Sequence, residues 1–397
     1  MKILQVVPYF PPAYAFGGPV KVAYQVSREL VKRGHEVVVH TSDAKDFDSR
    51  LEMNSTNIID GIKVHRFRNL SLTLVKKLKL FITPQLALFA GKEVKKFDVI
   101  HLHEYRTFQN VVIRHYACKY GVPYVLQAHG SLPRIMAWRK FKCTYDVFFG
   151  YRLLRDSSKV IALSRVEAEQ YRSLGVPEEK IAIIPNGINL SEYAELPPKG
   201  TFKKKFNIPE DKKIILYVGR IHKIKGIDFL VKAYAYLINK MNFRDAILVI
   251  AGPDDGYLGE VKSLVHNLGA LGSVILTGSL SERDKIKAYN DASIVAYLGP
   301  SEPYGLVSLE AAACKTPVIV AQGTPMAEVV NRGKFGYSIK YGDVASLAFA
   351  LRNILNNEEF AKNLGRNGRI YILNNFDWSK IIEKYEQMYR EVISGNA

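Results

Sequence analysis

Cysteine is scarce in this sequence, and long apolar runs are absent. The 397 residues include three cysteines, Cys118, Cys143 and Cys314, which lie far apart and form no Cys-x-x-Cys pair. Their spacing argues against a disulfide framework or a zinc site and fits a reducing compartment. No apolar stretch reaches the ~20 residues that cross a bilayer, and residues 1–10 are typical of a buried strand, not of a signal peptide. We therefore expect a soluble, cytoplasmic protein.

Negative charge is also scarce. The chain has 38 Asp and Glu against 56 Lys and Arg, a formal net charge of +18. Such an excess suits nucleic acid, an anionic membrane surface or phosphorylated small substrates. No helix-turn-helix pattern, zinc-finger spacing or aromatic–basic RNA motif accompanies it, so we expect no nucleic-acid partner.

Two basic and apolar segments, residues 70–97 and 134–155, keep membrane contact open as an alternative. Interfacial amphipathic helices have this composition. Packed helices with a lysine-rich outer face would give the first pattern. A helix with a buried aromatic face, or an acceptor-binding surface, would give the second. The composition does not decide between these explanations.

Short β-rich runs alternate with helical segments, which is typical of parallel sheets covered on both faces. Strands are expected at 3–7, 37–40, 62–67, 99–102, 124–128, 160–163, 181–184, 214–218, 246–251, 274–277 and 294–297. Residues 194–213 are rich in Pro, Gly and Lys, as linkers are. We predict two Rossmann-like α/β domains, 1–198 and 199–375, followed by an amphipathic helix within 376–397.

The stretch 301–313 combines two glutamates with a glycine and an apolar helix. Glu302 lies in a loop that passes through Gly305 into the helix carrying Glu310. Gly305 lets the backbone approach a ligand, and the amides of Leu306 and Val307 at the helix start favour phosphate. Glu302 is better suited to accept hydrogen bonds from hydroxyl groups. Amides for phosphate and carboxylates for a polyol indicate a nucleotide-sugar site, although a solvated loop before a buried helix would show the same spacing.

Charged or polar residues also follow other expected strands. Arg220 and Lys225 come just after strand 214–218, flanked by glycines, and could clamp a diphosphate, Arg220 bidentately and Lys225 as a point charge. His129 follows strand 124–128, where open α/β sheets bind ligands. His101 and His103 lie on the same side of their strand, so a metal pair is conceivable, but without further ligands we expect a polar strand end. For Arg220 and Lys225 the alternative is a basic surface turn. For His129 it is a structural histidine.

The segment 301–320, together with the Gly219-Arg220 and Lys225-Gly226 pairs, resembles the E-x7-E signature of the family-4 retaining glycosyltransferases. The resemblance covers nearly the whole chain and is strongest from 214 to 320. It implies the GT-B fold, two Rossmann-like domains facing across a cleft with the last helix crossing back onto the first. It also implies transfer of a sugar from a UDP-, GDP- or ADP-sugar with retention at the anomeric carbon.

The resemblance further implies roles for single residues. Arg220 and Lys225 would clamp the diphosphate. Glu302 would hold sugar hydroxyls, and Glu310 would hold the ribose. His129 would contact the transferred sugar from the first domain. Implied catalytic residues are His129, Glu302, Arg220 and Lys225. Implied donor-binding residues are Gly17, Gly18, Arg220, Lys225, Gly278, Glu302, Tyr304, Gly305, Leu306, Val307 and Glu310.

No clear nucleophile or paired carboxylate acid and base stands out in the sequence, and no D-x-D cluster stands out as a metal site. We therefore expect no required metal or cofactor, and the front-face mechanism usually proposed for the family. The basic surface favours a lipid-linked or oligosaccharide acceptor at a membrane. The alternatives are another GT-B enzyme, such as a sugar-nucleotide epimerase or a phosphorylase with pyridoxal phosphate, and a non-catalytic nucleotide- or membrane-binding module.

Overall fold

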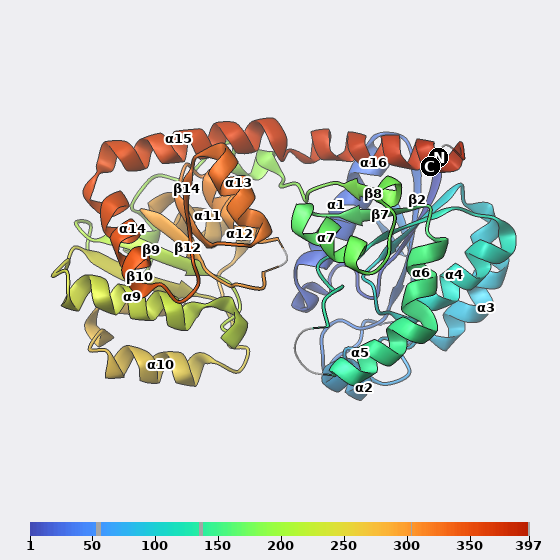
Figure 1. Ribbon diagram of the computed structural model, residues 1–397, viewed down its shortest axis with the longest axis horizontal. Coiled ribbons are helices and arrows are strands. Elements are labelled where there is room, and N and C mark those ends of the chain that lie inside the picture. Colours follow the sequence, from blue (N-terminus) through green and yellow to red (C-terminus); the bar gives the residue numbers. More distant parts are fainter. Residues whose placement is uncertain (53–56, 135–137, 303, 396–397) are drawn as a thin grey trace. The chain divides into compact units, whose positions relative to one another are not determined.

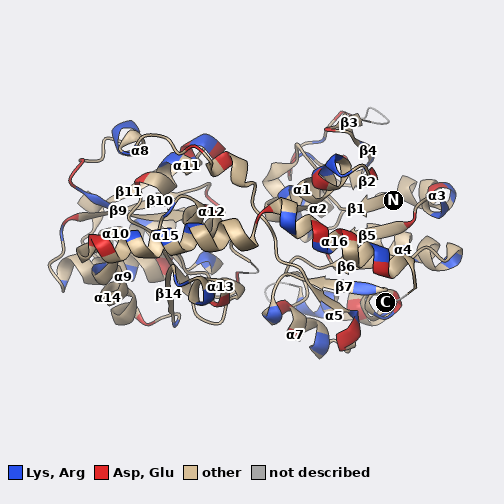
Figure 2. Cartoon of the chain, turned by 90° about the horizontal axis from the view of Figure 1, so that it is seen from above, with Lys and Arg blue, Asp and Glu red and all other residues tan. Residues whose placement is uncertain are grey.

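The structure is a computed structural model that describes residues 1–52, 57–134, 138–302 and 304–395. The chain forms two compact units (Figure 1). Unit 1 contains Met1–Gly187 and Trp378–Ala397, and unit 2 contains Ile188–Asp377. Figure 2 shows Lys and Arg on helices of both units, mixed with Asp and Glu. The excess of positive charge is therefore not confined to one unit.

Unit 1 is built on an eight-stranded sheet in the order β3-β4-β2-β1-β5-β6-β7-β8. All neighbouring strands pair in parallel except β3 with β4. Consecutive side chains in a strand point to opposite faces, so Ile3 and Leu4 enter two different hydrophobic clusters. The strands are β1 (Lys2–Val6), β2 (Glu36–Ser42), β3 (Asn57–Ile59), β4 (Ile62–Phe67), β5 (Val99–His103), β6 (Tyr124–Gln127), β7 (Lys159–Ala162) and β8 (Ile181–Ile183).

Helices cover both faces of this sheet. One cluster packs α1 and α16 against it, and the other packs α3, α4, α6 and α7. Side chains of Ser71, Thr107 and Ser164 cap α2, α4 and α7. The helices of unit 1 are α1 (Gly18–Lys32), α2 (Leu72–Leu78), α3 (Pro84–Glu93), α4 (Phe108–Tyr120), α5 (Arg139–Tyr145), α6 (Tyr151–Asp156), α7 (Arg165–Ser173) and α16 (Trp378–Ile393).

The last helix, α16, is part of unit 1 although unit 2 precedes it in the chain. Ile381, Tyr385 and Tyr389 are buried in the cluster that also contains α1. Glu386 accepts hydrogen bonds from Arg33 Nε at 2.6 Å and contacts His35 Nε2 at 2.5 Å. An apolar stripe and an ion-pairing stripe thus fix this helix against α1.

Unit 2 is built on a six-stranded parallel sheet in the order β11-β10-β9-β12-β13-β14. The chain order reverses at β9, which lies between β10 and β12; the carboxyl ends of strands at such a reversal form the usual ligand crevice of open α/β sheets. The strands are β9 (Lys213–Val218), β10 (Ala246–Ala251), β11 (Val274–Gly278), β12 (Ile294–Tyr297), β13 (Val318–Ala321) and β14 (Gly336–Ile339).

The helices of unit 2 again lie on both faces of the sheet. Helices α9 and α14 pack against each other, as do α12 and α15. The helices are α8 (Thr201–Lys205), α9 (Ile227–Asn239), α10 (Leu258–Asn267), α11 (Glu282–Asp291), α12 (Leu306–Ala313), α13 (Pro325–Gly333), α14 (Val344–Asn356) and α15 (Glu358–Asn375). Within the described residues, no helix is long and apolar enough to cross a membrane.

The boundary between the units differs from the one expected at 198/199, because unit 2 begins at Ile188. Backbone contacts explain the difference. The Ile188 N–H donates to the carbonyl of Phe376 at 2.8 Å, and Asp291 accepts from the N–H groups of Gly200 and Phe202, both at 2.7 Å. The expected linker is therefore folded onto unit 2, where it forms α8.

Candidate functional site

The loops after β9, β10 and β11 meet at the carboxyl edge of the unit 2 sheet. The Gly219 N–H donates to the carbonyl of Ala251 at 2.9 Å, and the Gly252 N–H donates to that of Gly278 at 2.8 Å. A Cβ atom on Gly252 would lie 1.8 Å from the Gly219 carbonyl oxygen. Only glycine fits there, and the loops form a continuous backbone surface beside the predicted clamp.

Arg220 lies on this edge and is half exposed, with 53% of its side chain accessible. Its Nη1 is 2.5 Å from Asp255 Oδ2 on the loop after β10. The Tyr217 hydroxyl donates to the Arg220 carbonyl at 2.9 Å, which fixes the backbone of the loop. An anion that binds Arg220 would compete with the Asp255 carboxylate for the guanidinium.

Lys225 and Glu302, which are 77 positions apart in the sequence, form an ion pair. Lys225 Nζ lies 2.5 Å from Glu302 Oε2, and the side chains are only 11% and 15% exposed. The same Nζ is 3.3 Å from the Tyr297 hydroxyl. Burial, and then the charge of Glu302, raise the pKa of Tyr297 well above its ordinary value, so this hydroxyl stays protonated. The structure therefore joins the predicted clamp lysine to the predicted hydroxyl-binding glutamate.

Helix α12 begins next to this pair. Gly305 precedes it with a left-handed φ of 80° and, as a glycine, provides no side-chain cap for its first turn. A Cβ atom on Gly305 would lie 3.4 Å from the Tyr297 ring and 3.7 Å from Glu302 Cγ. The amides of Leu306 and Val307 in that first turn carry the partial positive charge of a helix start. Tyr304 is buried at 4% exposure, and the intervening Pro303 lies outside the described residues.

Glu310, the second glutamate of the motif, lies in α12 and contacts α11. Its Oε2 accepts a hydrogen bond from the Tyr289 hydroxyl at 2.7 Å. Burial, and then the charge of Glu310, raise the pKa of Tyr289 well above its ordinary value. Tyr289 therefore remains a donor and holds the Glu310 carboxylate in one orientation.

In unit 1, His129 follows β6 and packs against a second histidine. His129 Nε2 lies 2.8 Å from His103 Nδ1, and His103 Nε2 lies 2.7 Å from Gln5 Oε1. Burial lowers the pKa of His129 to about 3 and that of His103 well below its ordinary value, so both rings are neutral near pH 7. The neighbouring His101 contacts the Tyr389 hydroxyl of α16 at 2.8 Å. Among the described residues, no group of three or more His, Cys, Asp or Glu could hold a metal ion.

Two carboxyl groups near His129 were not predicted: Glu104 is partly buried and Glu167 is buried. Glu104 Oε1 accepts from the Tyr9 hydroxyl at 2.6 Å, and Glu167 accepts from the N–H groups of Gly130 at 2.6 Å and Leu163 at 2.7 Å. Burial raises the pKa of each glutamate to about 7. A sequence signal existed for Glu167, which lies three residues after the N-cap residue of α7 as in a capping box, although its carboxylate bonds elsewhere.

Gly17 and Gly18 lie at the start of α1 and are exposed. Gly17 has φ 89°, and a Cβ atom on either glycine would meet nothing within 4 Å. Packing therefore leaves space above both glycines. The loop before them is held by Arg66, whose Nη2 donates to the Pro11 carbonyl at 2.5 Å.

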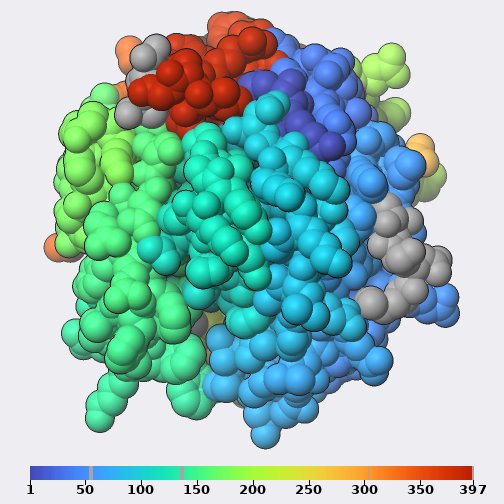
Figure 3. Space-filling view, turned by 90° about the vertical axis from the view of Figure 1, so that its right-hand side faces the viewer, coloured from blue at the N-terminus to red at the C-terminus, as the bar shows by residue number. Residues whose placement is uncertain are grey.

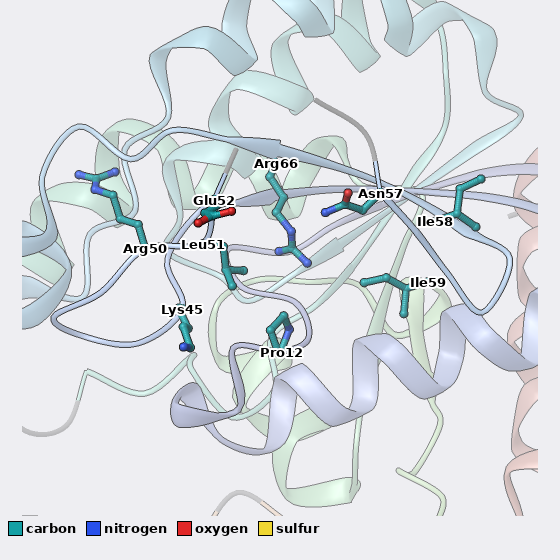
Figure 4. A pocket seen from close by; sticks show the side chains of 9 residues that line it. All are labelled: Pro12, Lys45, Arg50, Leu51, Glu52, Asn57, Ile58, Ile59 and Arg66. Carbon is teal, nitrogen blue, oxygen red and sulfur yellow. The ribbon is translucent and has the colours of Figure 1, made fainter. Parts of the chain in front are cut away.

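A hollow in unit 1 lies beside this loop. Figure 4 shows Arg66 pointing toward the space between Asn57, Ile59 and Pro12, while Arg50 points away from it. Arg50 is paired with Asp43 at 2.8 Å. None of the residues predicted to bind the donor lines this hollow, so it is separate from the set of predicted donor-binding residues.

Comparison with known proteins identifies the class. Residues 198–371 match the model of the glycosyl transferases group 1, and residues 16–192 match that of glycosyltransferase family 4. Together the two matches cover most of both units. The chain therefore belongs to the family-4 glycosyltransferases.

Individual relatives are similar along nearly their whole length. An uncharacterized glycosyltransferase of Methanocaldococcus jannaschii is 28% identical, with 98% of each chain covered. The N-acetyl-alpha-D-glucosaminyl L-malate synthase of Bacillus anthracis is 26% identical, with 95% of this chain and 94% of the relative covered. Among solved structures, Anabaena HepE in complex with UDP and glucose matches with a TM-score of 0.78 and 19% identity, covering 98% of this chain and 100% of that one.

These comparisons confirm the predicted family and fold class, two parallel-sheet α/β domains as in GT-B glycosyltransferases. The roles of single residues, the retention of configuration, the acceptor and the independence from metals and cofactors stay predictions.

Proposed function

We propose that this protein transfers a sugar from a nucleotide-diphosphate sugar to an acceptor, with retention at the anomeric carbon. One observation carries the proposal: the Lys225–Glu302 pair, at 2.5 Å, lies beside the start of α12, whose N-cap residue is Gly305. A cation and helix amides suit a diphosphate, and the carboxylate suits sugar hydroxyls. The complex of HepE with UDP and glucose, a protein of the same fold, supports this choice of donor.

In this proposal the bond between the anomeric carbon and the diphosphate breaks while an acceptor oxygen bonds the same face of that carbon. A donor phosphate oxygen takes the acceptor proton, so the chain itself need not supply a base. Arg220, Lys225 and the first amides of α12 stabilise the charge that develops on the leaving diphosphate. Glu302 holds sugar hydroxyls, Glu310 holds the ribose, and His129 contacts the transferred sugar. The proposal requires no metal or cofactor.

Thermal stability in the presence of UDP, GDP, ADP and their sugar conjugates tests donor binding. A ligand at a hundred times its Kd should raise the free energy of unfolding of the protein by about 2.7 kcal/mol. Lys225→Met should abolish most of this gain, whereas Lys232→Met, which removes an exposed lysine paired with Asp228 at 3.2 Å, should leave it intact. Equal gains in both variants would remove Lys225 from the donor site.

Turnover separates transfer from the alternative functions. Labelled sugar should appear on an acceptor, and NMR of the product should show the donor's anomeric configuration. Glu302→Gln should lose transfer and keep nucleotide-induced stabilisation, because it replaces one acceptor oxygen and the negative charge with an N–H donor and leaves Lys225 in place. An epimerase would change the donor sugar without an acceptor, and a binding module would release no nucleotide. An inverted product would refute retention.

We further propose a lipid-linked or oligosaccharide acceptor and contact with an anionic membrane surface. Trp138, Phe141 and Phe148, at the start of α5 and just after it, are 59%, 48% and 60% exposed. Lys142 lies in the last turn of α5, and Lys76 and Lys77 lie in the last turn of α2. Figures 1 and 3 show α2 and the segment around α5 at the same end of unit 1. Exposed aromatic rings beside lysines and arginines suit the interface of anionic lipids. Residues 135–137 of the predicted segment lie outside the described residues.

Co-sedimentation with vesicles tests this surface. Binding should be stronger to vesicles containing anionic lipid than to zwitterionic ones and should weaken with salt. The double variant Phe141→Ser, Phe148→Ser should bind less well. Leu271→Ser, at a 61% exposed residue of unit 2, is the control. Equal binding by both variants would show that this surface does not contact the lipid.

A further inference from the structure

His129 and Gly130 adopt an uncommon backbone conformation at the end of β6. Their φ angles are 52° and 80°, both in the left-handed region. Glycine takes this conformation freely, but histidine rarely does, because its Cβ crowds the neighbouring carbonyl. Surrounding contacts must therefore hold residue 129 in place.

Two buried side chains supply these contacts. His103, which is fully buried, lies 2.8 Å from the His129 ring nitrogen, and the two rings are nearly coplanar, with 7° between their planes. Glu167, at 3% exposure, accepts from the Gly130 N–H at 2.6 Å and ties it to the Leu163 N–H at 2.7 Å. The side chain of residue 129 and the amide of residue 130 are thus held from two different elements, β5 and α7.

The hydrogen bond to Gln5 sets where the protons lie. An amide oxygen only accepts, so His103 Nε2, 2.7 Å from Gln5 Oε1, carries the proton. A neutral imidazole has one N–H, so His103 Nδ1 accepts, and His129 Nε2 must donate. His129 Nδ1 then bears a lone pair, and it is buried without a hydrogen-bond partner among the described residues.

We propose that Gln5, His103 and Glu167 are positioning residues that hold His129 in one backbone conformation and one tautomer, with Nδ1 as the acceptor for a hydroxyl group of the transferred sugar. This inference rests on the proposed function for the ligand, but the tautomer and its cause are properties of unit 1 alone. The low pKa of both histidines agrees with neutral rings at the pH of the test.

Nitrogen NMR of protein labelled with 15N at its nine histidines tests the tautomer without any turnover. At pH 7, His129, assigned with a His129→Asn variant, should carry its proton on Nε2. Gln5→Met removes the acceptor for His103 and should leave His129 as a mixture of tautomers. A wild-type His129 protonated on Nδ1, or an unchanged spectrum in Gln5→Met, overturns the proposal. Protein with the expected tautomer but no transferase activity would refute only the proposed function.

Rescue tests the consequence for transfer. His103→Leu should lower kcat/KM by about 10- to 100-fold, because His129 loses the group that orients it. His103→Asn should recover most of this loss, since its side-chain oxygen can accept where Nδ1 did. His40→Leu is the matched control, a histidine of the same unit at 1% exposure, and should transfer like wild type. A fully active His103→Leu, or an Asn variant no better than Leu, would contradict the positioning role.

Discussion

Glu104 and Glu167 should each contribute less to the stability of unit 1 as pH rises from 5 to 8, whereas buried histidines such as His129 contribute in the opposite direction. Burial raises the pKa of each glutamate from an ordinary 4.5 to about 7. At a pH between 4.5 and 7, each carboxyl group is ionised in the unfolded chain and protonated in the folded one. The stabilisation by the protonated carboxyl is therefore complete below pH 4.5 and is lost as the pH passes 7. Each pKa unit corresponds to about 1.4 kcal/mol, so each group accounts for up to about 3 kcal/mol.

The perturbation is Glu104→Gln, which removes the titration and keeps the oxygen that accepts from Tyr9. Between pH 5 and pH 8, the free energy of unfolding of the variant should rise by up to about 3 kcal/mol relative to that of wild type. Urea denaturation followed by tryptophan fluorescence measures this in unit 1 alone, since both tryptophans, Trp138 and Trp378, belong to it. Glu36→Gln, at a glutamate 59% exposed, controls for the lost charge. A constant difference between the Glu104 variant and wild type at the two pH values would show that the pKa of Glu104 is not raised in the folded protein.

Three further substitutions test packing and polar burial. Asp146 is fully buried and pairs with two arginines, each at 2.8 Å. Asp146→Asn should therefore lower the free energy of unfolding of unit 1, followed by tryptophan fluorescence, by about 3–5 kcal/mol. A decrease below about 1 kcal/mol would mean that water reaches the arginines. Gly252→Ala places a Cβ atom 1.8 Å from the Gly219 carbonyl oxygen, so calorimetry should show a loss of about 1–3 kcal/mol in unit 2; an unchanged Tm would show that the loop relaxes freely. Arg66→Met removes the donor to the Pro11 carbonyl, 2.5 Å away. It should destabilise unit 1 by about 1–3 kcal/mol in urea, and a stabilised variant would contradict this.

Local sequence patterns were sufficient to predict most of the fold. Runs such as 214–218 and 246–251 are continuously apolar and β-rich, and they form the buried central strands β9 and β10. Strands β3, β13 and β14 were not predicted. β3 has only three residues and none is buried, so no hydrophobic periodicity marks it. Its position depends on antiparallel pairing with β4, which is a tertiary contact.

Composition was misleading at the boundary between the units. The Pro, Gly and Lys content of 194–213 indicated a linker, but Asp291, about ninety positions later, binds the backbone of this segment through Gly200 and Phe202. A segment's own composition carries no information about a carboxylate that reaches it from a distant helix.

For the site, the sequence alone was enough to predict which residue types lie at strand ends, because glycines, Lys225, Glu302 and His129 each follow an apolar run. Which of these residues meet depends on the tertiary fold. It joined Lys225 to Glu302 at 2.5 Å and His129 to His103 at 2.8 Å. It also partly buried Glu104 and buried Glu167, which moved their pKa to about 7. The reason is physical: hydrophobic periodicity is a property of neighbouring residues, whereas ion pairing, proton placement and desolvation depend on distances between residues far apart in the chain.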